Sequence, residues 1–533
     1  MGDRLQPVSW PIGDCRQDPD ACADFFAAVR NPYFLGDHPG LTQTFGWVDA
    51  WTMEPAGAVL AARSAGDVAA AIRFARRHRL RLVVKGGGHS YQGGSNAAGS
   101  LLVWTRQMRA ITLHDAFVPT GSEAAPVPAV TVEAGALWGE VYREVCVRGG
   151  RYVQGGGYLT VGVAGLVQSG GFGSFSKAFG TAAASLLAAE IVTADSRVRT
   201  VNATQEPDLL FALKGGGGGT FGVVTRLTLA THDLPPTLGA VFAEVRASSP
   251  TAFRRLIAEM LTFYAENLLD PHWGEQIVLR PGNVLALSMS LQGLSQAAAE
   301  RVWAPFWARL RAEPEAFRFP AEPTILAVPA RSYWDPAFLR TLPGVVLGDD
   351  RPGAPPERIF WAGNREEAGQ ILHAYQSAWL GADLLAVERR DALADALFAA
   401  SRQWSLSLHT NKGLAGSPAS VESAAATAMN PAVRHAFALV ICGAEGPPAY
   451  PGIPGHEPDV ARARQDAARV RAAMAALKER IPTGGSYLAE SDFFEPDWQQ
   501  AFWGANHARL TEIKRRYDPD GMFTIHHGIQ AAG

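Results

Sequence analysis

Four glycine clusters are the most chemically informative features of this 533-residue chain. They cover Gly86–Gly94, Gly155–Gly162, Gly165–Gly173 and Gly215–Gly222. Successive glycines allow backbone N–H groups to approach a phosphate or a planar ring without collisions from Cβ atoms. One cluster alone could be a tight turn. Because each glycine weakens the element that contains it, four clusters indicate a site where the backbone lies close to a ligand.

Two common nucleotide-binding motifs can be tested against these clusters. The P-loop pattern GxxxxGK[ST] is absent from all four. Gly217, Gly219 and Gly222 match GxGxxG, but the strand-like Val223–Thr225 follows them. A Rossmann site needs a helix N-terminus there to hold the pyrophosphate. The sequence therefore argues against both a P-loop and a Rossmann site.

The residues around the clusters resemble a known flavoprotein family. Lys85–Gly93, Gly156–Gly173, Asp208–Thr225 and Phe502–Gly528 are similar in order and spacing to motifs of the vanillyl-alcohol oxidase / p-cresol methylhydroxylase (PCMH-type) superfamily, and in particular its berberine-bridge-enzyme-like branch. The resemblance extends over nearly the whole chain. It implies an FAD-linked oxidoreductase with an α+β, two-domain PCMH-type FAD-binding fold and an inserted antiparallel-sheet substrate domain.

The resemblance also implies a covalently attached FAD. In the family, the histidine after the first glycines is bonded to the 8α-methyl group of the flavin, and His89 stands at that position. Bicovalent members have a cysteine where this chain has Tyr158, so we expect a single link, through His89. The cofactor-binding positions implied in this chain are His89, Gly86, Gly87, Gly88, Ser90, Tyr91, Gly93, Tyr158, Thr160, Val161, Gly162, Gly165, Ser169, Gly170, Gly171, Gly173, Gly222, Val223, Val224 and Asn506.

Two residues are candidates for the catalytic base. Oxidation of a C–OH or C–NH bond needs a group that takes the proton while hydride leaves. Tyr487 resembles the family's C-terminal active-site tyrosine and would act as a tyrosinate; a packed aromatic residue is the alternative. His409 is the second candidate, with a structural histidine as the alternative. Lys412 would either orient an anionic or sugar-like substrate or lie at the surface, and Glu490 and Asp492 are predicted to be exposed acids.

Two further positions bear on the reaction. Many family members have Tyr-x-Asn where this chain has Tyr487-Leu488-Ala489, which removes a hydrogen-bonding side chain at position 489. Val161 corresponds to a family position near the oxygen-reactive face of the flavin. A small valine there is associated with oxidases, so the resemblance favours oxygen as the electron acceptor.

Short strands and helices alternate over the first 230 residues and would position these motifs. Ala65–Leu80 carries Val68, Ile72 and Ala75 on one apolar face and is predicted to be a helix. Further helices are predicted at Ala136–Arg148 and Pro207–Leu213. The predicted strands are Arg81–Lys85, Leu101–Trp104, Ala129–Glu133, Glu190–Thr193 and Gly222–Leu229.

From about Asp233 the pattern changes. Val241–Arg246 and Ile277–Gln292 are predicted to form antiparallel strands of a wider sheet. Long Ala/Arg-rich helices are predicted at Ser295–Ala312, Asn364–Ala382, Arg389–Ala400 and Val460–Arg480. The last fifty residues again resemble the first region. We therefore expect an FAD-binding domain made of residues 1–233 and 482–533, with a substrate-binding domain of residues 234–481 inserted between them.

Composition and charge exclude several classes of protein. The chain is 47% hydrophobic and 19% charged, which is typical of a folded protein rather than a disordered one. The net charge is −3 without a basic block, so we expect no nucleic-acid partner. Apolar runs are too short for a membrane span. No secretory signal is visible at Met1–Pro11, so the sequence as it stands predicts a cytoplasmic protein, or an exported one if a signal has been removed.

The four cysteines are too few for a disulfide scaffold. Cys15 and Cys22 could pair in an exported protein, whereas Cys146 and Cys442 lie in apolar stretches and are predicted to be buried. No Cys/His spacing suits a zinc site, and the adjacent His526 and His527 cannot both bind one metal from a regular helix or strand. We expect no metal.

The function predicted from the sequence is an FAD-dependent oxidase of a small alcohol, sugar or secondary metabolite, with hydride transfer to covalent FAD and reduction of oxygen to hydrogen peroxide. Two alternatives remain open: a dehydrogenase that uses another electron acceptor, and a flavin-binding protein without turnover. A metal-dependent hydrolase has the least support. The substrate and the oligomeric state are not predicted.

Overall fold

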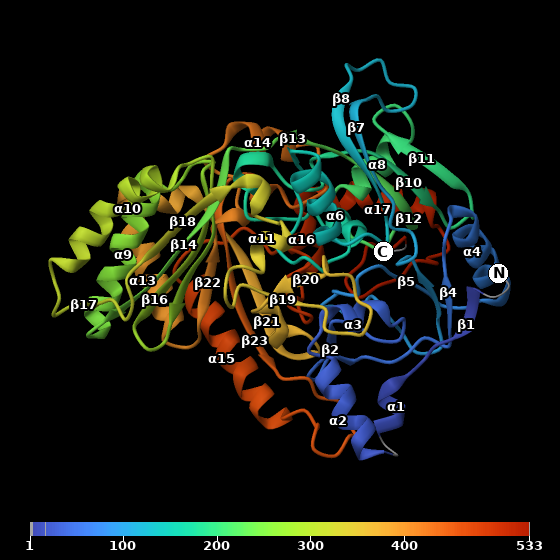
Figure 1. The fold of residues 1–533 in the computed structure, drawn as a ribbon, viewed down its shortest axis with the longest axis horizontal. Coiled ribbons are helices and arrows are strands. Elements are labelled where there is room, and N and C mark those ends of the chain that lie inside the picture. The colour runs from blue at the N-terminus through green and yellow to red at the C-terminus, as the bar shows by residue number, and fades with distance from the viewer. Residues whose placement is uncertain (1–3, 16–17, 532–533) are drawn as a thin grey trace.

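The computed structural model describes residues 4–15 and 18–531. The chain forms two lobes that lie side by side (Figure 1). One lobe contains two small sheets built from the first 230 residues, and the other contains one wide sheet with long helices. The predicted α+β combination of helices and largely antiparallel sheets is confirmed.

The first small sheet presents the first glycine cluster. Its strand order is β1 (Leu5–Pro7), β4 (Ala58–Ala61), β6 (Leu101–Trp104) and β5 (Leu82–Lys85), with β4, β6 and β5 parallel. Helix α4 (Ala65–His78) connects β4 to β5 and buries Val68, Ile72 and Ala75, as predicted. It begins at Ser64, whose hydroxyl accepts the backbone N–H of Asp67. Strand β5 ends at Lys85, where the glycines begin.

The second small sheet has five antiparallel strands. Their order is β11 (Val198–Asn202), β10 (Leu186–Val192), β12 (Val223–Ala230), β8 (Val127–Glu133) and β7 (Ile111–Phe117). Short helices surround it: α5 (Trp138–Tyr142) with a π-helical turn at Arg143–Arg148, α6 (Val163–Gln168), α7 (Ser176–Phe179) and α8 (Pro207–Leu213). Strand β12 directly follows Gly222, so the GxGxxG match leads into a strand, as the sequence predicts.

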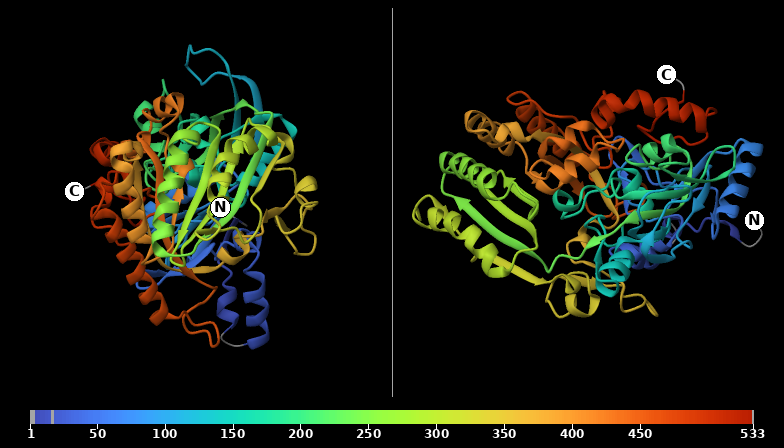
Figure 2. Two further views of the ribbon diagram at one scale, coloured as in Figure 1. Left: turned by 90° about the vertical axis from the view of Figure 1, so that its left-hand side faces the viewer. Right: turned by 90° about the horizontal axis from the view of Figure 1, so that it is seen from above.

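The wide sheet forms the core of the second lobe. Its order is β17 (Phe317–Arg318), β14 (Thr237–Ala247), β16 (Val284–Gln292), β15 (Trp273–Arg280), β22 (Leu406–His409), β23 (Ala436–Gly446), β21 (Gln370–Gly381), β2 (Thr44–Trp47) and β3 (Trp51–Thr52), with β18 (Thr324–Pro329) also pairing β14. Helices α9 (Pro250–Asn267), α10 (Gln296–Arg311), α13 (Val387–Ser401) and α15 (Val460–Lys478) bury apolar side chains against one face (Figures 1 and 2). The other face turns toward the first lobe.

The predicted helix at Asn364–Ala382 is wrong. The structure has one helical turn, α12 (Asn364–Glu367), and then the long strand β21. Strand β21 pairs β23 on one side and β2 on the other, so residues on both of its faces are buried. A strand buried on both faces reads as a nearly continuous apolar run and loses the alternation that marks a strand.

The C-terminal segment returns to the first lobe. Helix α16 (Trp498–Trp503) is followed by α17 (His507–Tyr517), which packs against α8. Figure 2 shows this C-terminal helix (red) beside elements of the first lobe. Strand β2, from the N-terminal region, pairs β21 in the wide sheet. The division into 1–233, 234–481 and 482–533 remains a proposal.

The remaining elements are short. Helices α1 (Pro11–Cys15), α2 (Pro19–Ala28) and α3 (Pro32–Asp37) lie near the N-terminus, and α11 (Pro336–Leu339) and α14 (Pro418–Ala424) lie in the second half of the chain. Two small ribbons pair β9 (Arg151–Tyr152) with β13 (His232–Asp233), and β19 (Val346–Gly348) with β20 (Ile359–Trp361). All four cysteines are buried free thiols, and Cys15 contacts Cys22. Among the described residues, no helix is both long and apolar enough to cross a membrane.

Candidate active site

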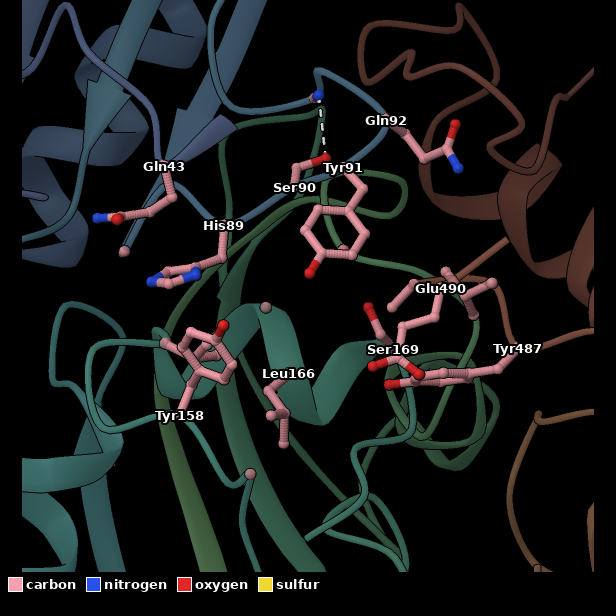
Figure 3. Close-up of a pocket in the computed structure, with 18 of the residues that line it drawn as sticks. Gln43, His89, Ser90, Tyr91, Gln92, Tyr158, Leu166, Ser169, Tyr487 and Glu490 are labelled. Carbon is pink, nitrogen blue, oxygen red and sulfur yellow. Dashed lines mark hydrogen bonds between the residues drawn. The ribbon is translucent and has the colours of Figure 1, made fainter. Parts of the chain in front are cut away.

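A cavity of about 640 Å³ lies between the two lobes (Figure 3). Its walls come from all four glycine clusters, from the inner face of the wide sheet and from the C-terminal segment. The volume falls within the range of small-molecule and cofactor sites. Figure 3 shows His89 and Tyr158 on one side of this cavity and Tyr487 and Glu490 on the other.

The glycine clusters touch one another at this wall. A Cβ atom on Gly87 would lie 2.7 Å from the backbone nitrogen of Gly162, so the first two clusters meet backbone to backbone. In the fourth cluster Gly217 and Gly219 have φ values of +102° and +73°, which side-chain-bearing residues rarely adopt. A Cβ on Gly165 would meet nothing within 4 Å. Gly157 and Gly165 therefore leave backbone facing open space, whereas Gly87 and Gly162 allow close packing behind it.

His89 is partly buried within the first cluster and directly follows Gly86–Gly88. The Thr160 hydroxyl lies 3.2 Å from its Nε2 atom. Burial lowers the pKa of His89 to about 4, and the neighbouring Lys85 lowers it further, although a hydrogen bond with Thr160 opposes the shift. The imidazole is therefore neutral near pH 7, which is the nucleophilic form.

Lys85 packs against the loop that carries His89. Its side chain is fully buried and donates hydrogen bonds to the carbonyl oxygens of His38, at 2.6 Å, and Leu41. A Cβ on Gly88, whose φ is +78°, would lie 2.9 Å from the Lys85 Cε atom. The glycine allows the loop to rest directly on the lysine, which fixes the position of His89.

Tyr158 lies beside His89 at the cavity wall. Its ring contacts His89 edge-on, with centroids 6.0 Å apart. Its hydroxyl is buried and forms no hydrogen bond with any described residue. The side chain lines the cavity, so this hydroxyl is available to a bound molecule.

Tyr487 lies in the opposite wall. Its hydroxyl oxygen accepts the backbone N–H of Gly171 at 3.3 Å, and its ring packs edge-on against Phe172. Burial raises the pKa of Tyr487, the nearby Glu490 carboxylate raises it further, and the Gly171 N–H opposes the shift. The phenol therefore keeps its proton near pH 7.

His409 comes from the inner face of the wide sheet, at the end of β22. Its Nδ1 atom is buried and has no hydrogen-bond partner among the described residues. Burial lowers its pKa well below the usual value, and the neighbouring Lys412 adds to this effect. A neutral imidazole with an unoccupied nitrogen therefore borders the cavity.

Lys412 and Glu490 form an ion pair within the cavity wall. The Lys412 Nζ atom lies 2.5 Å from a Glu490 carboxylate oxygen. Of the two alternatives for Lys412, a surface position is wrong because the residue is 8% exposed. The prediction that Glu490 and Asp492 are exposed acids is also wrong. Both are partly buried, and Asp492 accepts a 2.6 Å hydrogen bond from Gln376. Neighbouring residues fold over both acids, which local sequence does not reveal.

Three further acids in the cavity wall had no signal in the sequence. Glu275, Glu367 and Glu445 come from β15, α12 and β23. Glu275 has a positive φ of +68° and accepts a hydrogen bond from Ser174 at 2.6 Å. Burial raises the pKa of all three, to about 7 for Glu367. They lie far apart along the chain, and only tertiary packing brings them together.

Most of the predicted cofactor residues line the cavity, but some lie behind its wall. The predicted residues at the wall are Gly86, Gly87, Gly88, His89, Ser90, Tyr91, Tyr158, Val161, Gly162, Gly165, Ser169, Gly222 and Val224. Behind it are Gly93, Thr160, Gly170, Gly171, Gly173, Val223 and Asn506, of which Thr160 contacts His89 and Gly171 contacts Tyr487. Asn506 donates a hydrogen bond to the carbonyl of Met429 at 2.8 Å.

The cavity suits a planar, phosphate-bearing group on its glycine side. The bare backbone there leaves room for a flat ring and offers N–H groups to an anion. Nearby, the buried Tyr158 hydroxyl and the Nδ1 atom of His527 lack partners among the described residues. No grouping of three His, Cys, Asp or Glu side chains in the described part of the chain could hold a metal ion.

Two family models match the chain. One is described as FAD binding domain and covers residues 56–202, and the other is described as Berberine and berberine like and covers residues 486–530. These ranges contain three of the four glycine clusters in whole or part, and the C-terminal segment that lines the cavity.

A curated relative and two solved structures extend the comparison. FAD-linked oxidoreductase easE of Arthroderma benhamiae is 30% identical over 479 residues, 87% of each chain. The VAO-type flavoprotein MtVAO713 of Myceliophthora thermophila has a TM-score of 0.79 at 20% identity, over 99% of this chain and 93% of that one. Glucooligosaccharide oxidase of Acremonium strictum, which carries a 6-S-cysteinyl, 8α-N1-histidyl FAD, has a TM-score of 0.67 at 18% identity, over 89% and 92%.

Proposed function

Because this chain belongs to the FAD-linked oxidoreductases with a berberine-like C-terminal segment, we propose that it is an oxidase of a small alcohol, sugar or secondary metabolite. Bound FAD supplies the two-electron acceptor, which takes a hydride and is reoxidised by oxygen to give hydrogen peroxide. The substrate carbon loses the hydride and the attached oxygen or nitrogen loses a proton, so an alcohol becomes a carbonyl compound. Oxygen receives two electrons and two protons.

One observation carries this proposal: a glycine-rich wall that contains a neutral histidine faces a wall of polar side chains across one cavity. The first wall suits the cofactor and the second suits a substrate. Such an arrangement would bring a substrate carbon next to a bound ring.

We propose that His89 forms the single covalent link to FAD. Its neutral imidazole supports this role, and Thr160 occupies one ring nitrogen and leaves the other free to form the bond. The denatured protein should show an FAD-sized increase in intact mass, and His89→Ala should lose it. Because His114 lies on β7 outside the cavity, His114→Ala should keep the increase. A wild-type mass without the increment would refute the link.

Within the same cavity we propose that His409 takes the substrate proton and that Tyr487 donates a hydrogen bond to the substrate. The unoccupied Nδ1 of His409, on a ring that burial keeps unprotonated, supports the first role. The raised pKa of Tyr487 supports the second, because a protonated phenol can donate but cannot accept the proton as a tyrosinate would. This assignment favours His409 of the two catalytic residues that the sequence suggests.

Oxygen as the electron acceptor is supported by Val161, a small side chain at the cavity wall. The test is to reduce the flavin with substrate under anaerobic conditions and then admit air. An oxidase is reoxidised quickly and releases peroxide in proportion to substrate. Slow reoxidation in air, with fast reoxidation by a quinone, would identify a dehydrogenase. No bleaching of the flavin with sugars, aromatic alcohols or amines would indicate a flavoprotein without turnover.

A further inference from the structure

The cavity has two chemically different ends. The glycine clusters contribute no charged side chain to its wall, because His89 is neutral. The opposite end holds four carboxylic acids and one ammonium group, that of Lys412, and these are the only Asp, Glu, Lys or Arg side chains at the wall among the described residues. Three of the acids, Glu367, Glu445 and Glu490, act electrostatically on one another and are named here the carboxylate wall.

The carboxylate wall surrounds two tyrosines. The rings of Tyr91 and Tyr375, named here the tyrosine pair, lie with centroids 5.3 Å apart and planes inclined by 51°. Both rings and all three carboxylates line the same cavity. Burial raises the pKa of both phenols, and the three carboxylates raise it further. Gly443 leaves space for the Tyr375 ring, since a Cβ there would lie 3.2 Å from it. Figure 3 shows Tyr91 and Glu490 pointing into the cavity.

Two acids of the carboxylate wall have no ion-pair or hydrogen-bond partner in the described chain, Glu367 and Glu445. The nearby His373, which itself contacts Asp466, opposes the rise in the pKa of Glu445. Acids with a structural role in this protein are paired: Asp349 contacts Arg351 and Arg358, and its pKa falls to about 2. Burial without a cation is costly for a carboxylate, which is why the pKa of Glu367 rises. A bound cation would remove that cost.

Burial is graded along the wall. Glu445 is the most exposed of the three, Glu367 and Glu490 are partly buried, and Glu490 lies beside Lys412. A graded series of carboxylates attracts a cation inward. The unpartnered Nδ1 of the buried His409 points to a bound molecule at the deeper end.

From this juxtaposition we propose that the protein selects substrates that carry a protonated amine, held between the tyrosine pair and the carboxylate wall. The proposal rests on the proposed function and narrows it to one class of substrate. Aromatic faces attract alkylated ammonium groups through the ring quadrupole, and the carboxylates supply the opposite charge. The groups facing Glu367 are Glu445, Glu490 and the tyrosine pair, with Lys412 beyond Glu490.

The test compares three ligands of similar shape on the flavin-loaded enzyme. They are N-methyl-2-phenylethylamine, which is cationic, 2-phenylethyl methyl ether, which is neutral, and 3-phenylpropionate, which is anionic. Binding is measured by the rise in Tm and by the change in flavin absorbance. We expect the cation to bind at least about tenfold more tightly than the ether, the anion to bind most weakly, and added salt to reduce the preference. Equal binding, or no binding of the amine, overturns the proposal.

Substitutions in the carboxylate wall test whether these acids cause the preference for a cationic ligand. Glu367→Gln, Glu445→Gln and Glu490→Gln should each weaken binding of the amine and leave the ether unchanged. The control is Glu366→Gln, since Glu366 pairs with Arg30 at the surface and lies outside the cavity. A preference that survives all three cavity substitutions overturns the proposal, even if one variant folds poorly.

A ligand with a permanent positive charge shows whether a pH effect on binding comes from titration of the enzyme or of the ligand. N,N,N-Trimethyl-2-phenylethylammonium keeps its charge at every pH. Glu367 has a pKa of about 7, so its carboxylate takes up a proton as the pH falls below 7. Binding of this ligand should therefore weaken below pH 7. Peroxide release from sugars or neutral alcohols, without binding of either ammonium ligand, would refute this inference while leaving the oxidase proposal intact.

Discussion

Gly87 and Gly162 meet so closely that neither position has room for a side chain. The substitution Gly87→Ala tests this contact, because its Cβ would lie 2.7 Å from the Gly162 backbone nitrogen. Overpacking of this kind costs about 1–3 kcal/mol, and it displaces the loop that carries His89. We expect a lower Tm and a lower fraction of covalent FAD. Gly282→Ala is the control, because a Cβ there meets nothing within 4 Å. Equal Tm values for both variants would contradict the backbone contact.

His409 and Tyr487 should respond differently to conservative substitution. His409→Asn keeps a hydrogen-bonding group but cannot take a proton, so kcat should fall by roughly 10²–10⁴-fold. Tyr487→Phe removes one hydrogen bond and should cost about tenfold. Because burial holds His409 neutral, kcat should show no titration near pH 6.5. A larger loss in Tyr487→Phe than in His409→Asn would restore tyrosine as the base.

At this scale the sequence predicted more residues of the glycine-rich wall than of the opposite wall of the cavity. The glycines and His89 occur in contiguous motifs, so their chemistry is visible locally. Glu275, Glu367 and Glu445 are single acids on three separate elements, and no spacing rule connects them. Lys412 was recognised as a possible substrate-orienting residue and Glu490 was expected to be an exposed acid, because their pairing depends on the fold.

Among the elements, α17 depends on one buried lysine. Lys514 Nζ donates hydrogen bonds to the carbonyls of Thr220 and Phe523 at 2.6 and 2.7 Å, and pairs with Asp518 at 2.6 Å. It therefore connects the C-terminal helix to the fourth glycine cluster. Secondary structure alone would not reveal this connection, since the residue reads as an ordinary helix-end lysine.

Lys514→Met should destabilise the protein strongly. It leaves the Asp518 carboxylate buried without its cation, and breaking a buried pair in this way costs about 3–5 kcal/mol. Urea unfolding measures the loss, and flavin release should accompany it because the fourth cluster loses its support. Lys478→Met, at the exposed end of α15, should change stability by less than about 0.5 kcal/mol. A similar effect of both substitutions would show that the buried network contributes little.

Most elements were predicted correctly because their periodicity reflects one buried face, as in α4 and in strands β15 and β16. Strand β21 was predicted as a helix because both of its faces are buried. Its neighbours, β23 and β2, come from distant parts of the chain. The local sequence pattern therefore could not show that this segment forms a strand.

For the whole molecule, Lys177 joins the two lobes. It lies in α7 of the first lobe, and its Nζ atom lies 2.5 Å from the hydroxyl oxygen of Tyr264 in α9 of the second. Burial lowers the pKa of Lys177 to about 7, although Asp270 opposes the shift. In the unfolded chain the same group has a pKa near 10.4.

This difference predicts a pH dependence of stability. Between pH 7 and about 10 the unfolded chain holds a proton that the folded protein lacks, so raising the pH favours the folded state, by up to about 1.4 kcal/mol per pH unit. Relative to Lys177→Met, the wild-type protein should therefore gain free energy of unfolding from pH 7 to pH 9. Urea titrations at pH 7, 8 and 9 measure this gap. A gap that stays constant would mean that Lys177 keeps its proton throughout.

The cavity takes its walls from residues as early as Pro32 and as late as Gly528. During synthesis on a ribosome, the N-terminal region emerges long before α17 and its Lys514 contacts can form. Cofactor attachment should therefore follow the release of the chain rather than accompany its growth. Ribosome-stalled chains ending before α17 should remain free of bound flavin, so attachment would report that the chain has been made through its C-terminal segment.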